Sequence, residues 1–307
     1  MRTDSEPALP GAGLAAAKMP GHWLLARLGK RVLRPGGLDL TRSLLCALGI
    51  RPSDAVVEFA PGFGATTRMV RALRPACYVA LEQDEAAAGR IAELLTDSNQ
   101  RCLIGSAEES PLRDRSATVV YGEAMLTMQG LTQKRQIIHE ASRILKPGGR
   151  YGIHELCLIP DDLDEARKTE IQQALSAVIH VGARPLTATE WRSLLEDEGF
   201  NVRSERLRPM RLLKPSRLLA DEGLAGALRF AWNLCRDAAA RERVLAMRRI
   251  FEKYRPHLAA IMLVGIKRSV RDWHDDFSPR PTRNNGEAFP RERTSAWNPD
   301  WRRARFS

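Results

Sequence analysis

Apolar residues in the first half of the chain alternate between short continuous runs and longer helical segments. The runs Ala55–Ala60, Cys77–Leu81 and Arg101–Ile104 have the length of buried strands. Thr66–Leu73 and Asp84–Leu95, which lie between these runs, predict helices. Strands that alternate with helices of this length indicate parallel crossover units, and therefore a doubly wound α/β sheet.

The alternation continues through the next forty residues. Ala117–Tyr121 predicts a fourth strand, and Gln133–Leu145 has the pattern of an amphipathic helix. Lys146-Pro147-Gly148-Gly149 predicts the turn that ends this helix. Arg150–Leu158 then predicts a fifth strand.

Helical spacing flanks this region on both sides. Residues 22–50 show it twice, before and after a break at Arg34–Gly37. The later segments predict, in chain order, a helix at Asp161–Val181, a helix at Ala188–Glu198 with a capping box from Thr187 and Glu190, a strand at Asn201–Arg206, two or more helices in Arg217–Arg255, and a strand at Leu258–Lys267. We therefore expect a mainly parallel, seven-stranded sheet with N-terminal helices and a helical insertion before the last strand.

This pattern predicts one folded domain between two irregular ends. The ends are rich in small, proline, arginine and polar residues and lack any period. The expected parts are a flexible arm (1–21), a single domain (22–269) and a disordered tail (270–307). Within the domain we expect covering helices (22–50), a ligand-binding core (51–158), a mostly helical part (159–257) and the last strand (258–269).

Composition adds a strong positive charge to this picture. The chain carries a formal net charge of +11, which favours anionic partners such as nucleic acid, acidic lipid surfaces or phosphate-bearing substrates. The aromatic content of 6% argues against a surface built to stack bases. A basic enzyme without such a partner is the simpler interpretation.

The cysteines and the apolar runs bear on compartment and cofactors. The five cysteines are scattered without any C-x-x-C pair, so we predict no zinc site and no other metal. Such a set fits a reducing compartment. The sequence contains no apolar run of the roughly 18 residues that a membrane helix needs. We therefore expect a cytoplasmic protein, although peripheral membrane contact stays open.

A glycine-containing loop follows the first strand and opens the next helix. It contains Gly62 and Gly64, which allow the backbone to approach a ligand closely. Ligands of open α/β sheets bind at such carboxyl ends of strands. The acid Glu58 is foreign to the dinucleotide pattern and suits a ligand that carries an ammonium group. Glu82, which ends the second strand, suits a ribose diol; a tight turn without any ligand is the alternative.

Taken together, these segments resemble the class I S-adenosylmethionine-dependent methyltransferases. The family's first motif, acid-x-Gly-x-Gly-x-Gly, is matched by Glu58-x-Ala60-x-Gly62-x-Gly64, with alanine in place of the first glycine. Alanine is tolerable there if its φ angle stays negative. The resemblance implies a Rossmann-like methyltransferase fold and S-adenosyl-L-methionine as the cofactor.

The resemblance extends in order over residues 50 to 158. Gly105–Leu112 resembles the family's segment after the third strand, with Ser106 in place of the usual aspartate, and Glu140–Arg150 resembles the turn into the fifth strand. Thr187–Val202 resembles the small-molecule branch that includes the ubiquinone/menaquinone methyltransferases. The cofactor contacts that the resemblance implies are Glu58, Ala60, Pro61, Gly62, Gly64, Glu82, Gln83, Ser106, Ala107, Glu108 and Glu123.

No residue pattern identifies a catalytic base. Glu123 leaves the fourth strand and His154 lies in the fifth, so both are candidates, and a structural histidine is the simpler interpretation of His154. His22 and His180 lie on the expected covering helices, and His139 lies in the helix before the fifth strand. Each of these three is more often structural.

Three functions remain open from the sequence. The first is methyl transfer to a small, lipophilic or anionic molecule held under the flanking helices. The second is methylation of RNA or protein, which the net charge of +11 motivates. The third is a non-catalytic cofactor-binding homologue, motivated by the departures at Ala60 and Ser106. The sequence leaves the accepting atom and the oligomeric state undetermined.

Overall fold

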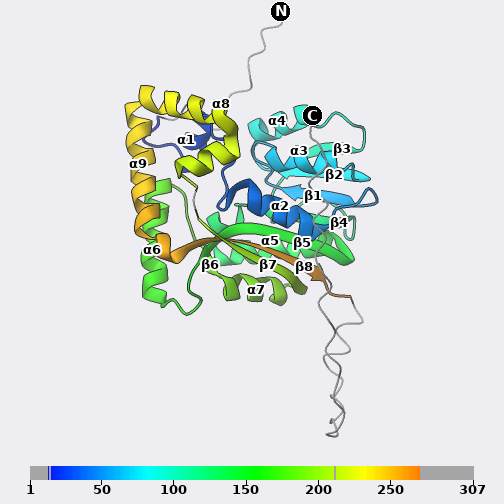
Figure 1. Cartoon of the computed structure of the whole chain (residues 1–307). Helices are drawn as coiled ribbons and strands as arrows, with labels where there is room; N and C mark the ends of the chain where they lie inside the picture. Colours follow the sequence, from blue (N-terminus) through cyan, green and yellow to red (C-terminus); the bar gives the residue numbers. More distant parts are fainter. Residues whose placement is uncertain (1–12, 14, 211, 270–307) are drawn as a thin grey trace, which may run out of the picture.

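The computed structural model describes residues 13, 15–210 and 212–269. The predicted tail at 270–307 and most of the predicted arm therefore lie outside the described residues. The fold is a central sheet with helices on both faces (Figure 1). Its strands are β1 (Ala55–Phe59), β2 (Cys77–Glu82), β3 (Gln100–Ile104), β4 (Ala117–Glu123), β5 (Leu145–Leu158), β6 (Leu186–Thr187), β7 (Phe200–Pro209) and β8 (Leu258–Lys267).

The sheet has the order β3-β2-β1-β4-β5-β8-β7, and the two-residue β6 pairs with β5. The pairs that β1 makes with β2 and β4, and that β5 makes with β4, are parallel. β8 runs antiparallel between β5 and β7. The predicted doubly wound, mainly parallel sheet of seven strands is confirmed, with β6 as a short addition. Its chain order reverses between β1 and β4, where ligands bind in folds of this kind.

The helices lie where the periodicity places them, with small shifts of their ends. They are α1 (Gly21–Arg27), α2 (Gly37–Leu48), α3 (Ala65–Ala72), α4 (Glu85–Leu94), α5 (Leu131–Ile144), α6 (Glu165–Ile179), α7 (Ala188–Asp197), α8 (Pro215–Arg236) and α9 (Ala238–Lys253). The capping box of α7 is formed as predicted from Thr187 and Glu190. Among the described residues, no helix has the length and apolar character needed to cross a membrane.

The predicted turn at Lys146–Gly149 is wrong. β5 already begins at Leu145, and these residues form an irregular stretch inside it. Leu145 pairs with Ala117, whereas the next paired position, Arg150, faces Val119. The excess residues on β5 therefore bulge out of the ladder. Gly148, at a φ of 74°, supplies the left-handed backbone that the bulge uses.

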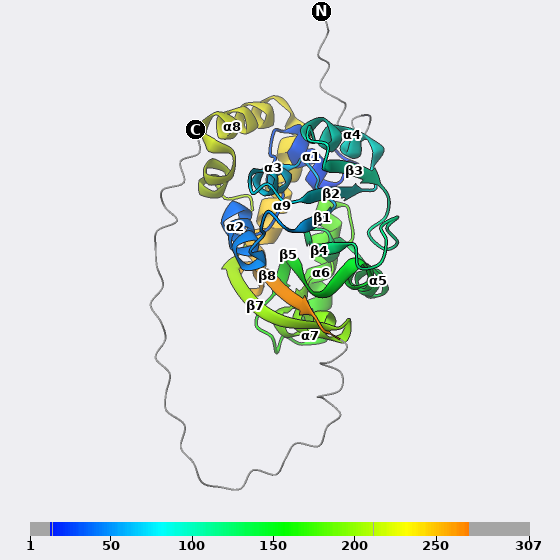
Figure 2. The same cartoon turned by 90° about the vertical axis from the view of Figure 1, so that its right-hand side faces the viewer.

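Helices cover the two faces of the sheet as separate layers. α5 and α7 share one buried apolar cluster with the sheet, and α2, α3 and α4 share another. Figure 2 shows α2 and α3 on one side of the sheet and α5 on the other. α2 repeats leucine every four residues, and Leu40, Leu44 and Leu48 are all fully buried. Their spacing places them on one helical face against β5 and β8.

A third group of helices lies over the ligand-binding end of the sheet. This group consists of α1, α8 and α9, which form one apolar cluster that includes Leu24, Phe230 and Val244. We call these helices, together with the rest of residues 21–48, the cover; its helix α2 lies on the face of the sheet described above. In Figure 1 α8 lies beside α1, with α9 and α6 along one flank. α8 is interrupted at Gly223, whose φ of 71° and ψ of 176° are not helical. The predicted two or more helices in this stretch are confirmed.

The close contact between α2 and β5 gives a test of this packing. A Cβ atom at Gly152 would lie 2.8 Å from Cδ1 of Leu44 and 3.1 Å from Cδ2 of Leu48. Gly152→Ala should therefore lower the free energy of unfolding by about 1–3 kcal/mol. The same change at Gly89, where a Cβ meets nothing within 4 Å, should raise it by about 0.5–1 kcal/mol. Urea unfolding at constant m-value measures both, and equal effects of the two changes would contradict the packing.

Candidate functional site

The loop after β1 turns the chain by using left-handed backbone. Ala60, Gly62 and Gly64 have φ angles of 50°, 57° and 69°. The condition under which alanine would be tolerable at position 60, a negative φ, is not met. The Ala60 N–H donates to the carbonyl of Leu81 at 2.9 Å as the backbone leaves the sheet. A non-glycine residue in this region costs about 1–3 kcal/mol. A Cβ atom at Gly64 would lie 2.4 Å from Cδ1 of Leu94, so the Leu94 side chain would have to move.

A cleft of about 220 Å³ opens beside this loop. We call it the cofactor cleft. Three carboxylates from the ends of three strands line it, together with loop backbone and residues of the cover. Of the residues predicted to contact a cofactor, the structure brings together at this cleft Glu58, Ala60, Pro61, Gly62, Glu82 and Glu123.

Glu58 lies at the bottom of the cleft and is almost fully buried. Its Oε2 accepts a hydrogen bond from the hydroxyl of Thr67 at 2.8 Å and another from Tyr78. Burial raises the pKa of Glu58 to about 7, although these hydrogen bonds act in the opposite direction. A cation bound next to it would favour the ionised carboxylate. The arrangement therefore suits the ammonium-bearing ligand that the sequence predicts.

Glu82 is held in a fixed orientation at the end of β2. Its Oε1 accepts hydrogen bonds from the backbone N–H of Gln83 at 2.9 Å and of Asp84 at 3.2 Å. Burial raises its pKa, and the backbone hydrogen bonds oppose this shift. The carboxylate lines the cleft. A carboxylate fixed in this way is suited to accept hydrogen bonds from a sugar diol.

The other predicted contacts do not line this cleft. Gln83 has an exposed side chain, and Ser106, Ala107 and Glu108 are partly exposed. The Ser106 hydroxyl accepts a hydrogen bond from the N–H of Glu108 at 3.1 Å, so it stabilises its own turn. Their proposed contacts with an adenine ring stay predictions.

Glu123 joins several segments at the end of β4. Its carboxylate accepts hydrogen bonds from the Thr41 hydroxyl at 2.6 Å and from Thr66, and it pairs with the Arg34 guanidinium. The Nδ1 atom of His154 lies 2.7 Å from its Oε1. Burial disfavours the charged form, but Arg34, His154 and Thr41 lower the pKa of Glu123 to about 2. A carboxylate engaged in this way is a poor proton acceptor.

His154 also has contacts at both of its ring nitrogens. It is fully buried in β5, and its second ring nitrogen, Nε2, contacts the carbonyl oxygen of Pro35. Both ring nitrogens of His154 are therefore in contact with protein oxygen atoms, Nδ1 with Glu123 and Nε2 with Pro35. These contacts favour a structural role for His154 over the role of a catalytic base.

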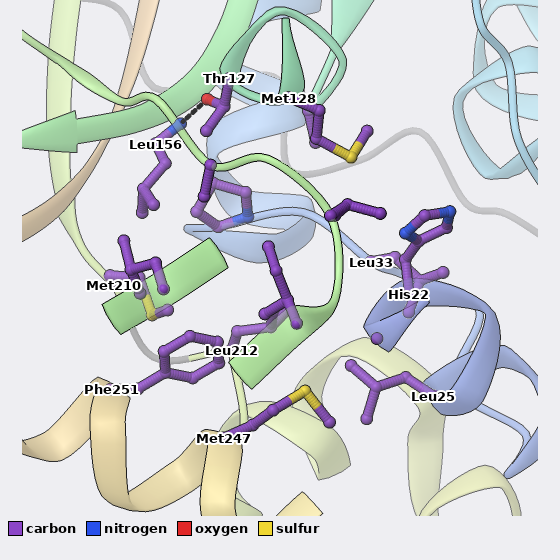
Figure 3. A pocket seen from close by; sticks show the side chains of 17 residues that line it. His22, Leu25, Leu33, Thr127, Met128, Leu156, Met210, Leu212, Met247 and Phe251 are labelled. Carbon is purple, nitrogen blue, oxygen red and sulfur yellow. Dashed lines mark hydrogen bonds between the residues drawn. The ribbon is translucent and has the colours of Figure 1, made fainter. Parts of the chain in front are cut away.

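A second cavity, of about 130 Å³, adjoins the cofactor cleft. We call it the apolar cavity. Figure 3 shows its wall of aliphatic, sulfur-containing and aromatic side chains from the cover, α6 and the strand ends. Four residues line both spaces: His22, Leu33, Ala124 and Met128. The cleft and the cavity therefore share a wall.

His22 is the titratable residue of this shared wall. It lies on α1 with its ring 4.7 Å from the Trp23 ring, and Figure 3 shows it at the edge of the apolar cavity near Leu33. Burial lowers its pKa to about 4, so the ring is neutral at neutral pH. His139 is largely exposed next to Glu198, and His180 ends α6; neither lines the cleft or the cavity.

The sequence patterns did not identify Arg34 and Thr41, the two polar residues of the cover that contact Glu123. Arg34 and Thr41 belong to no motif, and their partner Glu123 lies 82 or more positions away. The available signal was Thr41, a polar residue within the apolar repeat of α2, whereas Arg34 lies between α1 and α2. Within the described ranges, no three or more His, Cys, Asp or Glu residues gather as a metal site would require.

Comparison with known proteins agrees with this geometry. A sequence model of the methyltransferase domain family matches residues 57–153. An uncharacterized protein of Haemophilus influenzae is 31% identical over 248 residues, which span 78% of this chain and 96% of that protein. The chain belongs to the class I S-adenosylmethionine-dependent methyltransferases. It is an enzyme of this family, and S-adenosyl-L-methionine is its cofactor.

Solved structures share the fold at low sequence identity. A putative sarcosine dimethylglycine methyltransferase from Galdieria sulphuraria has a TM-score of 0.59 at 18% identity, covering 75% of this chain and 84% of that chain. Haemonchus contortus phosphoethanolamine N-methyltransferase 2 has a TM-score of 0.61 at 14% identity, covering 81% and 58%. Geranyl diphosphate C-methyltransferase from Streptomyces coelicolor A3(2) has a TM-score of 0.54 at 16% identity, covering 75% and 77%. The ubiquinone/menaquinone branch stays a prediction.

The Glu123 network yields a test of how the cover is held. Glu123→Gln leaves Arg34 and His154 without their buried anion, so the free energy of unfolding should fall by about 3 kcal/mol. The pKa of Glu123 is about 2 in the fold and ordinarily 4.5. Its stabilisation is therefore present above pH 4.5 and is lost as the pH falls toward 2.

Urea unfolding from pH 7 to pH 3 measures this difference between wild type and Glu123→Gln. The variant should show a weaker loss of stability below pH 4.5 than the wild type. Replacement of Asp97, an exposed acid paired with Arg71, by asparagine is the control and should change little. Parallel pH profiles of wild type and Glu123→Gln would contradict the assignment.

Proposed function

We propose that this enzyme transfers the methyl group of S-adenosylmethionine to a small apolar molecule held in the apolar cavity. The observation that carries this proposal is the shared wall of His22, Leu33, Ala124 and Met128. A methyl donor in the cofactor cleft and an acceptor in the cavity would meet across it. Methyl transfer is an in-line displacement, so two adjoining sites satisfy its geometric need.

The cofactor residues are part of this proposal. The cofactor supplies the activated methyl carbon, and the protein supplies position and electrostatics. Glu58 and the loop backbone from Ala60 to Gly64 would hold the methionine part, and Glu82 the ribose hydroxyls. Gln83, Ser106, Ala107 and Glu108 would contact the adenine end. The buried carboxylates and the open backbone at Gly62, where a Cβ meets no atom within 4 Å, fit such a ligand.

The lining of the apolar cavity favours an uncharged acceptor. Its wall contains Leu175, Met247 and Phe251, and no acidic or Lys/Arg side chain is among its described lining residues. The Thr127 hydroxyl is already engaged, since it donates to Glu155 at 2.7 Å and accepts from the N–H of Leu156 at 3.3 Å. A charged group would lose its hydration here without gaining a partner.

His22 is the proposed polar contact of the acceptor molecule. Its imidazole lines both spaces, and burial lowers its pKa to about 4, so the ring is neutral and a weak base. A neutral ring nitrogen can accept a hydrogen bond from a hydroxyl of the acceptor and so orient it. Glu123 and His154, by contrast, would position the cover.

The two other functions receive less support. A nucleotide or a peptide side chain would have to enter an apolar cavity of about 130 Å³ under the cover, so methylation of RNA or protein is not favoured.

The direct experiment incubates the protein with methyl-labelled cofactor and either a lipid extract or an aqueous extract of host cells. Label in the lipid fraction alone supports the proposal. Cofactor binding without any transfer would indicate a non-catalytic homologue.

Glu82→Ala tests the cofactor half of the site. The change removes an oriented carboxylate that would accept two charge-assisted hydrogen bonds, so the affinity for S-adenosylmethionine should fall at least about 100-fold. Isothermal titration calorimetry measures it. Glu85→Ala, which removes an exposed acid three residues further on, should bind as the wild type. Near-normal affinity of Glu82→Ala would show that the ribose lies elsewhere.

Val181→Phe tests the acceptor half. Val181 lines the apolar cavity but not the cofactor cleft, and the added ring would fill the space offered to the acceptor. Labelling of the lipid extract should fall by about tenfold or more, with unchanged cofactor affinity. Leu131→Phe, at an exposed position of α5, is the control. Wild-type labelling by Val181→Phe would place the acceptor outside this cavity.

A further inference from the structure

The second half of α8, residues 224–236, presents apolar side chains to solvent. Leu224, Leu228 and Trp232 are 68%, 62% and 62% exposed. They recur every four residues, so they lie along one side of the helix. Ala231 and Cys235, also exposed, belong to the same side. We call these five residues the outer face of α8.

The opposite side of this helix packs against α1. Phe230 is buried in the cluster with Leu24 and Leu25 of α1, and the Asn233 amide donates to the carbonyl of Leu28 at 3.2 Å. The helix is therefore apolar on its inner and on its outer side. Helices of this kind are normally covered by protein or lipid. In Figures 1 and 2, α8 lies at the upper edge of the molecule, and the sheet lies below it.

The charged side chains within residues 224–236 are all positive, and the next acid, Asp237, pairs with Arg27 at 2.8 Å. Residues 224–236 include two arginines, Arg229 and Arg236, and no acid. The Arg236 guanidinium lies over the Trp232 ring at 5.4 Å, and Arg241 of α9 donates to the carbonyl of Cys235 at 3.0 Å. These contacts hold two cations at the edge of the apolar side chains.

The acids of α8 lie before the break at Gly223 and face inward. Asp221 and Glu222 pair with the buried Lys30 at 3.6 Å each, and Glu222 accepts the N–H groups of Arg31 and Val32. The negative charges of Asp221 and Glu222 are therefore paired with groups inside the cover. The half of α8 after the break keeps an apolar face with a positive edge.

We propose that the outer face of α8 docks onto an anionic lipid surface, with its leucines and Trp232 among the acyl chains and its arginines at the headgroups. Apolar helices with arginine at the edge and Trp and Leu on the face bind membranes in this way. A second copy of the chain is a poorer occupant, because a symmetric contact would bring the arginines of both faces together. This proposal goes beyond the proposed function and does not depend on it.

The docking surface also lies close to the two cavities. α8 packs on α1, and α1 carries His22 of their shared wall. One helix layer therefore separates the proposed membrane contact from the apolar cavity. A molecule that partitions into lipid would reach the cavity from a nearby reservoir.

Vesicle flotation with the full chain tests the proposal without any methyl acceptor. The wild type should float with phosphatidylcholine vesicles that contain phosphatidylglycerol, and should bind pure phosphatidylcholine much more weakly. The variant with Leu228→Ser and Trp232→Ser should lose binding by about tenfold or more. Arg229→Gln and Arg236→Gln should each lower binding about fivefold at low salt.

Controls separate docking from folding and from self-association. Leu131→Ser, at a site 55% exposed on α5, should float as the wild type, and all variants should keep the wild-type melting temperature and cofactor affinity. Failure of the wild type to bind anionic vesicles, or equal binding by the Leu228/Trp232 variant, overturns the proposal. So does a wild-type dimer in light scattering that the same variant converts to a monomer, since the face would then join two copies.

Discussion

The carboxylate of Glu123 is the point at which the sheet and the cover are joined. It lies at the end of β4, next to the strand reversal of the sheet, and contacts Arg34 and Thr41 of the cover, Thr66 of α3 and His154 of β5. Each of these groups is buried, so each needs a partner inside the protein. One anion thereby fixes the position of the cover over the strand ends.

The position of the cover defines both spaces of the site. Leu33 and His22 come from it and line the cofactor cleft and the apolar cavity together. The three carboxylates come from the ends of strands β1, β2 and β4, and the loop directly follows β1. Chemical selectivity would come from the cover, since its side chains form much of the apolar wall. In the proposed reaction, residues of the sheet would bind the methyl donor, and residues of the cover would determine which acceptor molecule binds.

The elements that could be predicted from the sequence are those fixed by local pattern. The strand and helix alternation, the glycine loop and the capping box of α7 depend on neighbouring residues, and they appear where the pattern places them. The bulge at Lys146–Gly149 was taken for a turn, because proline and glycine signal a break without specifying its geometry.

The candidate site was less accessible to sequence reasoning. The motif spacing indicated Glu58 and Glu82, which line the cleft. The φ of Ala60 depends on a hydrogen bond to Leu81, and the partners of Glu123 come from segments remote in the chain. Such contacts leave no periodic trace in the sequence. His22 becomes a candidate only because it lies in the wall shared by the two spaces, and this wall forms only when the cover packs on the sheet.

The anchoring of the cover also has a consequence for the order of folding. Glu222 accepts the N–H of Val32 across 190 positions of the chain. During synthesis the N-terminal helices emerge first, but Asp221 and Glu222, which hold Lys30 and Val32, emerge only after the strands from β1 to β7 have been made. Long-range closure of this kind is slow, because the chain entropy is lost before the contact is gained. Completion of the cofactor cleft therefore depends on residues that are made late in synthesis, although its glycine loop directly follows the first strand.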